Sequence, residues 1–169
     1  MKTFRSPQIL FILLVLGIVL GFAIGYPRLP ERMASHFGMD GRPNGWQPKP
    51  AFTIFFFGAL GIACVVSLAV PKLLGSLPLD MINLPNKEYW LAPERRADSV
   101  RFLQDQMAFF GCAILGLLAV AMFSAIQANL TANPQMDPTL FFIALGAFIA
   151  FAVYSAVRTF SRFGKPPGG

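Results

Sequence analysis

The chain has 169 residues, of which 55% are hydrophobic and 13% are charged, about half the charged share of an ordinary soluble domain. Its 18 Phe are more than a core of this length can bury, so lipid must solvate much of the surface. The formal net charge is +6, but the basic residues gather at the ends of apolar runs, as expected next to anionic lipid headgroups. No nucleic-acid-binding motif occurs, and we expect no nucleic-acid partner.

Four segments of 20 residues or more contain no charged side chain: 6–27, 50–71, 106–136 and 138–157. A helix needs roughly 20 apolar residues to cross the ~30 Å hydrocarbon layer, and isolated strands would leave backbone groups unpaired there. The sequence therefore predicts an all-α membrane protein, a bundle of four transmembrane helices with one polar extracytoplasmic loop and one cytoplasmic loop. The predicted spans are about 8–26, 51–70, 93–127 and 139–160.

The first span could be read as a signal peptide, because Lys2 and Arg5 precede it and Ala23, Ile24 and Gly25 resemble a cleavage site. Its apolar stretch is longer than that of a signal peptide, which favours a retained anchor.

The ends of the other spans follow from local signals. The second span is predicted to end at Pro71. Pro93 suits a first helical turn, so the third helix is predicted to begin there, outside the lipid. Asp137 or Thr139 is the predicted cap of the fourth.

Basic residues are distributed unevenly between the two sides of this arrangement. Ten lie on the side that holds both termini and the second loop: Lys2, Arg5, Lys72, Lys87, Arg95, Arg96, Arg101, Arg158, Arg162 and Lys165. Four lie on the other side: Arg28, Arg32, Arg42 and Lys49. The positive-inside rule therefore predicts cytoplasmic termini and an outward-facing loop 27–50.

Small residues recur at intervals of four in the spans, and such spacing lets helix backbones approach closely. The predicted packing positions are Gly17, Gly21, Gly25, Ala59 and Ala63. The contact could be made within one chain or between two copies. The spans contain no Asp, Glu, Lys, Arg or His at depth, which disfavours transport by a charge relay.

The loop between Pro27 and Pro50 contains two strong turn signals, Asp40-Gly41 and Asn44-Gly45, which predict a small hairpin. His36 is the only histidine of the chain. A metal site needs three or four ligands, and the two cysteines, Cys64 and Cys112, lie inside apolar runs, so we expect no metal, no cofactor and no disulfide. His36 is expected to bond the backbone of its own loop or to lie near headgroups.

The same loop resembles a known family. The matching residues, in order, are Pro30, Met33, His36, Phe37, Gly41, Gly45, Trp46 and Lys49. They resemble the domain of unknown function at the start of SdpI-type bacterial immunity proteins, over roughly residues 10–70. In those proteins the full-length chain recognises a peptide toxin from outside and holds a transcription repressor at the membrane. The resemblance implies a bacterial inner-membrane protein with an SdpI-like two-helix domain at 1–71, followed by a second part at 72–169.

The loop INLPNKEYWLAPERR is the second candidate binding region. Its candidate partner-binding residues are Asn86, Lys87, Tyr89 and Trp90. The aromatic pair suits the headgroup layer, and Arg95 and Arg96 are expected to meet lipid phosphates. The segment is either a turn lying on the membrane or a docking surface for a protein partner.

Two functions remain open at this point. One is a binding or regulatory membrane protein that senses or resists an extracytoplasmic peptide through residues such as His36 and Trp46. The other is a non-catalytic accessory or structural subunit of a larger membrane complex. No Ser/His/Asp set, carboxylate pair or metal cluster is recognisable, so an enzyme is not expected.

Overall fold

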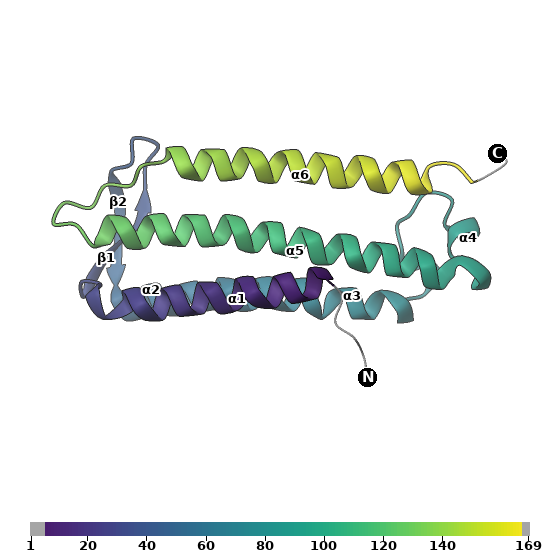
Figure 1. Ribbon diagram of the computed structural model, residues 1–169, viewed down its shortest axis with the longest axis horizontal. Helices are drawn as coiled ribbons and strands as arrows, with labels where there is room; N and C mark the ends of the chain where they lie inside the picture. The colour runs from purple at the N-terminus through teal and green to yellow at the C-terminus, as the bar shows by residue number, and fades with distance from the viewer. Residues whose placement is uncertain (1–5, 167–169) are drawn as a thin grey trace.

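The structure, a computed structural model, describes residues 6–166 and is mostly helical (Figure 1). Lys2 and Arg5, used above for the charge balance, lie outside the described residues. The main helices and strands are α1 (Ser6–Gly25), β1 (Arg32–Phe37), β2 (Pro43–Pro48), α2 (Lys49–Leu68), α3 (Val70–Leu73), α4 (Lys87–Trp90), α5 (Pro93–Asn129) and α6 (Thr139–Phe163). Short 3-10 turns are η1 (Tyr26–Arg28), η2 (Leu74–Ser76) and η3 (Leu79–Met81).

Within residues 6–166, four helices are long and apolar enough to cross a membrane, which supports a multi-pass membrane protein. Their positions agree with the four predicted spans, and α5 begins at Pro93 as predicted. The helix α2 ends at Leu68, close to the predicted end of the second span, and the helical path continues beyond it through α3 and η2 to Ser76. Pro71 lies in the first turn of α3, where the missing N–H of proline costs no intrahelical hydrogen bond.

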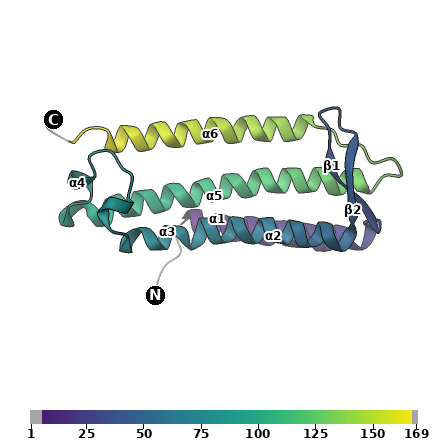
Figure 2. The same ribbon diagram turned by 180° about the vertical axis from the view of Figure 1, so that it is seen from behind.

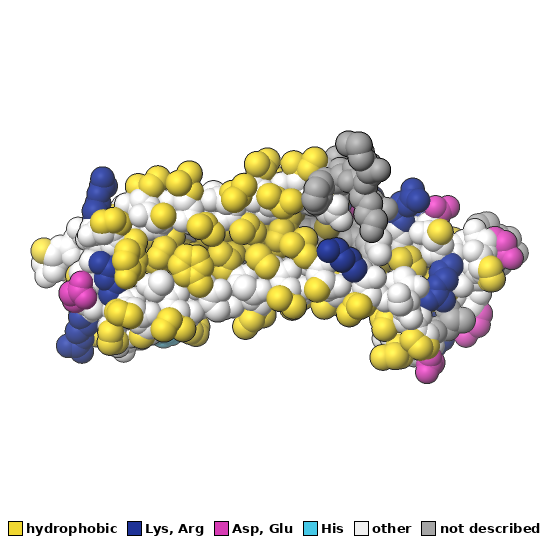
Figure 3. All heavy atoms as spheres, turned by 90° about the horizontal axis from the view of Figure 1, so that it is seen from below, with side chains coloured by type: hydrophobic (Ala, Val, Ile, Leu, Met, Phe, Trp, Pro, Cys, Tyr) yellow, Lys and Arg dark blue, Asp and Glu magenta, His cyan; other side chains and the backbone are white. Residues whose placement is uncertain are grey.

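The helix α5 is the centre of the arrangement (Figures 1 and 2). It packs against α1 and α2 on one side and against α6 on the other. The β1–β2 hairpin lies at one end of the bundle, here named the hairpin end, and α4 lies at the other, the α4 end. Apolar side chains cover the middle of the face drawn in Figure 3, while charged side chains gather toward the two ends.

The main core fills the space between α1, α2 and α5. Phe11, Phe56 and Leu115 are among its fully buried side chains, and Phe22 stacks on Phe56 with ring centroids 4.8 Å apart. A tight contact between two helices lies at Gly111, where a Cβ atom would collide with the side chain of the buried Ser67. A glycine is therefore required at this crossing of α2 and α5.

The predicted packing role of the α1 glycines is only partly met within the chain. A Cβ atom at Gly25 would lie 3.3 Å from Ile126 Cγ2, so this glycine does lie at a tight contact. A Cβ atom at Gly17 or Gly21 would meet no described atom within 4 Å, so neither glycine lies at a close helix contact within the chain, and a contact with a second copy stays a prediction there. The reason is the rotation of α1, which turns bulky Phe22 into the core and leaves these glycines beside an open groove. In α2, Ala63 is buried and Ala59 is half-buried.

Candidate functional site

The predicted hairpin is present, so the fold includes a two-stranded antiparallel sheet in addition to its helices. Ala34 pairs with Trp46 and His36 with Gly45, with irregularities on both sides of His36. The turn is closed by a hydrogen bond from Gly38 N to Arg42 O of 2.8 Å. The side chain of Asp40 supports it by accepting from Arg42 N at 3.1 Å, as turn signals of this type predict.

Buried Asn129 fastens this hairpin to the last turn of α5. Its Oδ1 accepts from Ala34 N at 2.7 Å, and its Nδ2 donates to Ala34 O and to Ala125 O, both at 2.8 Å. Ala34 is fully buried and Asn129 is 3% exposed, so these bonds form away from water. The amide of Asn129 thereby takes the place of a third strand beside β1, and the hairpin is held in a fixed position on α5.

The loop between α5 and α6 holds the tip of the hairpin. Met136 N donates to Gly41 O at 2.9 Å. Gly41 has φ +75°, and a Cβ atom there would collide with Met136 O, so only glycine suits both the turn and this contact. Gly41 therefore positions a loop, and it is buried instead of lying on an exposed binding surface.

The other predicted residues of the hairpin divide into exposed and buried ones. His36 is exposed, and its Nδ1 contacts Asn44 Oδ1 across the hairpin. A Cβ atom at Gly45 would lie 2.9 Å from His36 Cβ, so the glycine leaves room for the histidine. Trp46 is 43% exposed, with the guanidinium of Arg32 5.8 Å from its ring centroid. Phe37 is half-buried.

Lys49 lies beneath the hairpin and not on its exposed surface. It is 8% exposed, its Nζ donates to Leu29 O at 2.9 Å, and it sits 4.4 Å from the ring centroid of Tyr26. A buried ammonium group is stable only with such partners, a carbonyl oxygen and an aromatic face. We therefore assign Lys49 a structural part in joining the end of α1 to the start of α2.

At the α4 end, the predicted partner-binding residues close the C-terminus of α6. Asn86 has a left-handed backbone with φ 49°, and its Nδ2 donates to Phe163 O and Gly164 O at 3.1 and 3.0 Å. Trp90 Nε1 donates to the same Phe163 O at 3.0 Å. The last carbonyl groups of a helix have no intrahelical partner, and here two side chains of another segment supply the donors. Lys87 lies half-buried in α4 beside them.

The two arginines that follow also form hydrogen bonds within the chain, and their contact with lipid phosphates stays a prediction. Arg95 Nε donates to Tyr89 O at 2.8 Å, and its guanidinium lies 3.9 Å from the centroid of the Tyr89 ring. Arg96 Nη2 donates to Leu77 O at 2.7 Å. Guanidinium groups satisfied by carbonyls and an aromatic face tie the 77–90 segment to the first turns of α5.

The two sets of predicted residues therefore lie at opposite ends of the bundle and share no site (Figure 1). The helix α5 connects them, since Asn129 holds the hairpin at its last turn, and Ser99 Oγ near its start donates to Trp90 O at 2.7 Å. Sequence reasoning missed Asn129. The available signal was a pair of amide residues, Gln127 and Asn129, at the end of a long apolar run. Within residues 6–166 the structure shows no group of three or more His, Cys, Asp or Glu that could hold a metal ion.

Comparison with known proteins gives one match. Residues 12–62 match the family model of a domain of unknown function, DUF1648, which is found in SdpI-type membrane proteins. No curated protein and no solved structure matches the chain. The matched segment covers α1 from its second turn, the whole hairpin and most of α2. Residues 12–62 are therefore similar to DUF1648, a domain found in SdpI-type membrane proteins, and Asn129 of α5, which holds the hairpin in place, lies outside the matched segment.

Proposed function

We propose that the chain is a non-catalytic binding protein of the bacterial inner membrane, whose hairpin receives an extended peptide on the outer side. The observation that carries the proposal is the attachment of the hairpin to α5, in which the side chain of Asn129 forms hydrogen bonds with both the N–H and the C=O of Ala34. A hairpin alone is marginally stable in water, whereas one fixed to a long helix is a rigid platform. Rigid platforms lose little conformational freedom on binding.

The hydrogen bonds between Asn129 and Ala34 also determine which edge of the hairpin is free to pair with a peptide. Ala34 directs its N–H and C=O away from β2, so Ala34 and Trp46 form a pair without hydrogen bonds between them. The N–H and C=O of Trp46 then point to the outer edge of β2. Among the described residues, no hydrogen bond from outside the hairpin reaches them. An extended peptide can pair at this position, and the half-exposed indole supplies an aromatic contact.

Pro43 and Pro48 flank this edge and lack the N–H groups that longer strand pairing needs. The backbone therefore offers a peptide only a short pairing site, and side chains must provide most of the affinity. Trp46, with Arg32 against its ring, and exposed His36 are the side chains that carry this role in the proposal.

The outward orientation follows from charge. Among the described residues, eight Lys or Arg lie at the α4 end and four at the hairpin end, and the positive-inside rule then directs the hairpin outward. Met39, 84% exposed at the hairpin tip, is a suitable reporter position. A Met39→Cys variant in intact cells should react with a membrane-impermeant maleimide from outside. Reaction only after the cells are opened would reverse the orientation.

Peptide binding is tested with the full chain in nanodiscs and an immobilised library of extended peptides. Trp46→Ala should weaken capture by about tenfold or more, as expected for a central aromatic contact. Met39→Ala, on the same hairpin, is the matched control and should bind like the unmodified chain. Equal capture by the Trp46 variant would exclude this edge as the binding site.

The alternative, an accessory subunit of a larger complex, is favoured by one observation. The helix α6 packs chiefly against α5 and leaves most of its apolar surface open. Lipid can cover such a surface, and so can a partner helix. An accessory subunit should copurify with a larger membrane complex at fixed ratio after mild detergent extraction, whereas a peptide receptor should not.

A further inference from the structure

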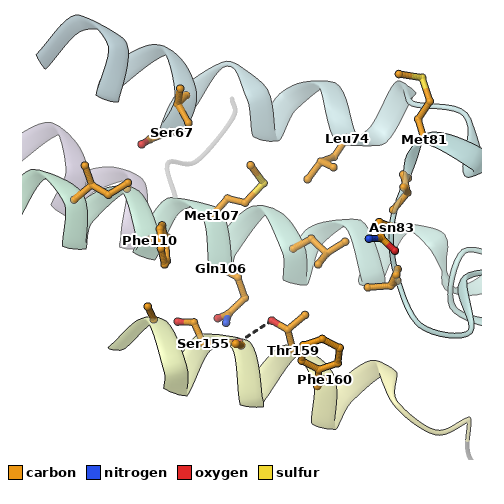
Figure 4. Close-up of a pocket in the computed structure, with 18 residues that line it drawn as sticks. Ser67, Leu74, Met81, Asn83, Gln106, Met107, Phe110, Ser155, Thr159 and Phe160 are labelled. Atoms are coloured by element: carbon orange, nitrogen blue, oxygen red, sulfur yellow. Dashed lines mark hydrogen bonds between the residues drawn. The ribbon is translucent and has the colours of Figure 1, made fainter. Parts of the chain in front are cut away.

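A trough of about 510 Å³ runs between α2 and α6, with α5 as its floor and the 81–84 segment closing it toward the α4 end (Figure 4). Its volume lies within the roughly 300–1,000 Å³ range of small-molecule sites. Apolar side chains line most of it, including Leu74, Met107 and Phe110. It opens sideways between two membrane-spanning helices, so an occupant enters from the bilayer.

One polar group in the trough has no partner. Ser155 is 9% exposed, and its hydroxyl is the buried side-chain atom without any hydrogen bond among the described residues. Ser155 lines the trough together with Gln106, and both side chains point into the space between α5 and α6 (Figure 4). A buried hydroxyl without a partner is costly, so an acceptor supplied by an occupant would stabilise this arrangement.

The depth of Ser155 indicates which acceptor is available. Arg158 Nη1 donates to Gln106 Oε1 at 3.0 Å, and this polar pair marks the end of the apolar part of α5 and α6. Ser155 lies three residues from Arg158, about 4.5 Å deeper along α6. In a bilayer, the ester carbonyl groups of phospholipids lie at this boundary between hydrocarbon and headgroup.

The charge at the rim agrees with a phosphate. Arg158 and Arg162 are about one turn apart on α6, and their guanidinium groups lie 5.3 and 4.6 Å from the centroid of Phe102. Eight basic residues against five acidic ones (Asp80, Glu88, Glu94, Asp98 and Asp105) lie at this end within the described chain. Such an excess of positive charge attracts anionic lipid headgroups.

We infer that this trough binds one phospholipid, with an acyl chain along Met107 and Phe110, an ester carbonyl accepting from Ser155 Oγ and the phosphate at Arg158. The site is distinct from the hairpin and independent of the proposed peptide binding. In this arrangement a lipid fills the space between α2 and α6 and is a structural component of the bundle.

The inference is tested with the full chain in nanodiscs that contain phosphatidylglycerol with a photoreactive diazirine in one acyl chain. Crosslinks should concentrate on the trough-lining residues of α5 and α6. Ala152→Leu, which fills the trough, should reduce them strongly. Ala150→Leu, the same change on an exposed position of α6 outside the trough, should leave them unchanged. Equal labelling of both variants, or labelling spread evenly over the lipid-facing surface, would overturn the inference.

Two further measurements identify the groups involved. Ser155→Ala, which keeps the helix intact, should lower the fraction of chain that retains lipid in native mass spectrometry by about two- to tenfold, the equivalent of one hydrogen bond. A diacylglycerol with the same diazirine lacks the phosphate and should label the trough less. Equal labelling by the two lipids would show that the phosphate does not contribute to binding at Arg158. A lipid-free dimer with an unlabelled trough would assign the trough to a second copy of the chain and refute the lipid.

Discussion

Replacement of Asn129 is the most direct test of how the hairpin is attached to α5. Asn129→Leu keeps a side chain of similar length but removes the partners of Ala34 N and Ala34 O, which bond to the amide at 2.7 and 2.8 Å. Both groups belong to a fully buried residue. A buried backbone group left without a partner costs about 1–3 kcal/mol, so the two together cost about 2–6 kcal/mol.

The assay is amide hydrogen exchange of the hairpin in nanodiscs, with Ala34 N–H as the direct reporter. A loss of 2 kcal/mol, the lower limit, corresponds to about 30-fold faster exchange at this amide. Asn133→Ala, a change at an exposed asparagine in the following loop, is the matched control and should leave the exchange unchanged. If Ala34 N–H exchanges at the same rate in the Asn129 variant, the hairpin is held by other contacts, and the role of Asn129 in attaching it to α5 is refuted.

Three further changes probe the bundle and its ends. Gly111→Ala should lower stability in detergent by about 1–3 kcal/mol, because the new Cβ collides with α2, whereas Gly116→Ala, which meets no described atom within 4 Å, should not. Trp90→Phe removes a donor to the end of α6 and should cost about 0.5–1.5 kcal/mol by thermal unfolding, while an unchanged midpoint would contradict this cap. Hydrogen bonds from the side chain and backbone of Thr139 lower the pKa of Asp137, so its stabilisation of the α6 start is fully present above the ordinary Asp pKa and is lost as pH falls through the lowered pKa. Carboxyl NMR titration checks this, and a normal pKa at Asp137 would contradict it.

The helical spans could be predicted because their signal is local. An apolar run of about 20 residues is long enough to cross the bilayer as a helix, whatever it packs against. The hairpin was predictable for a similar reason, since Asp40-Gly41 and Asn44-Gly45 reverse the chain through their own backbone preferences. The start of α5 at Pro93 likewise depends on one residue and its fixed φ angle.

The rotation of each helix about its axis was not predictable from spacing. Gly17 and Gly21 have the spacing of a packing motif, yet α1 turns Phe22 toward the core and leaves both glycines beside a groove. A glycine that does lie at a tight contact between helices is Gly111, which belongs to none of the predicted packing positions. The rotation of a helix about its axis is decided by the combined fit of its large side chains, whereas small residues only permit a close approach of two helices.

The sequence by itself determined that this chain has four helices long and apolar enough to cross a membrane and a polar hairpin between the first two of them, because hydropathy and turn preference act over a few residues. Only the tertiary structure decided what the polar residues do. Asn129 meets Ala34 across 95 positions, and Trp90 meets Phe163 across 73. Such pairs form because the ends of helices bring their unpaired backbone groups together, and no local pattern records which side chain will satisfy them.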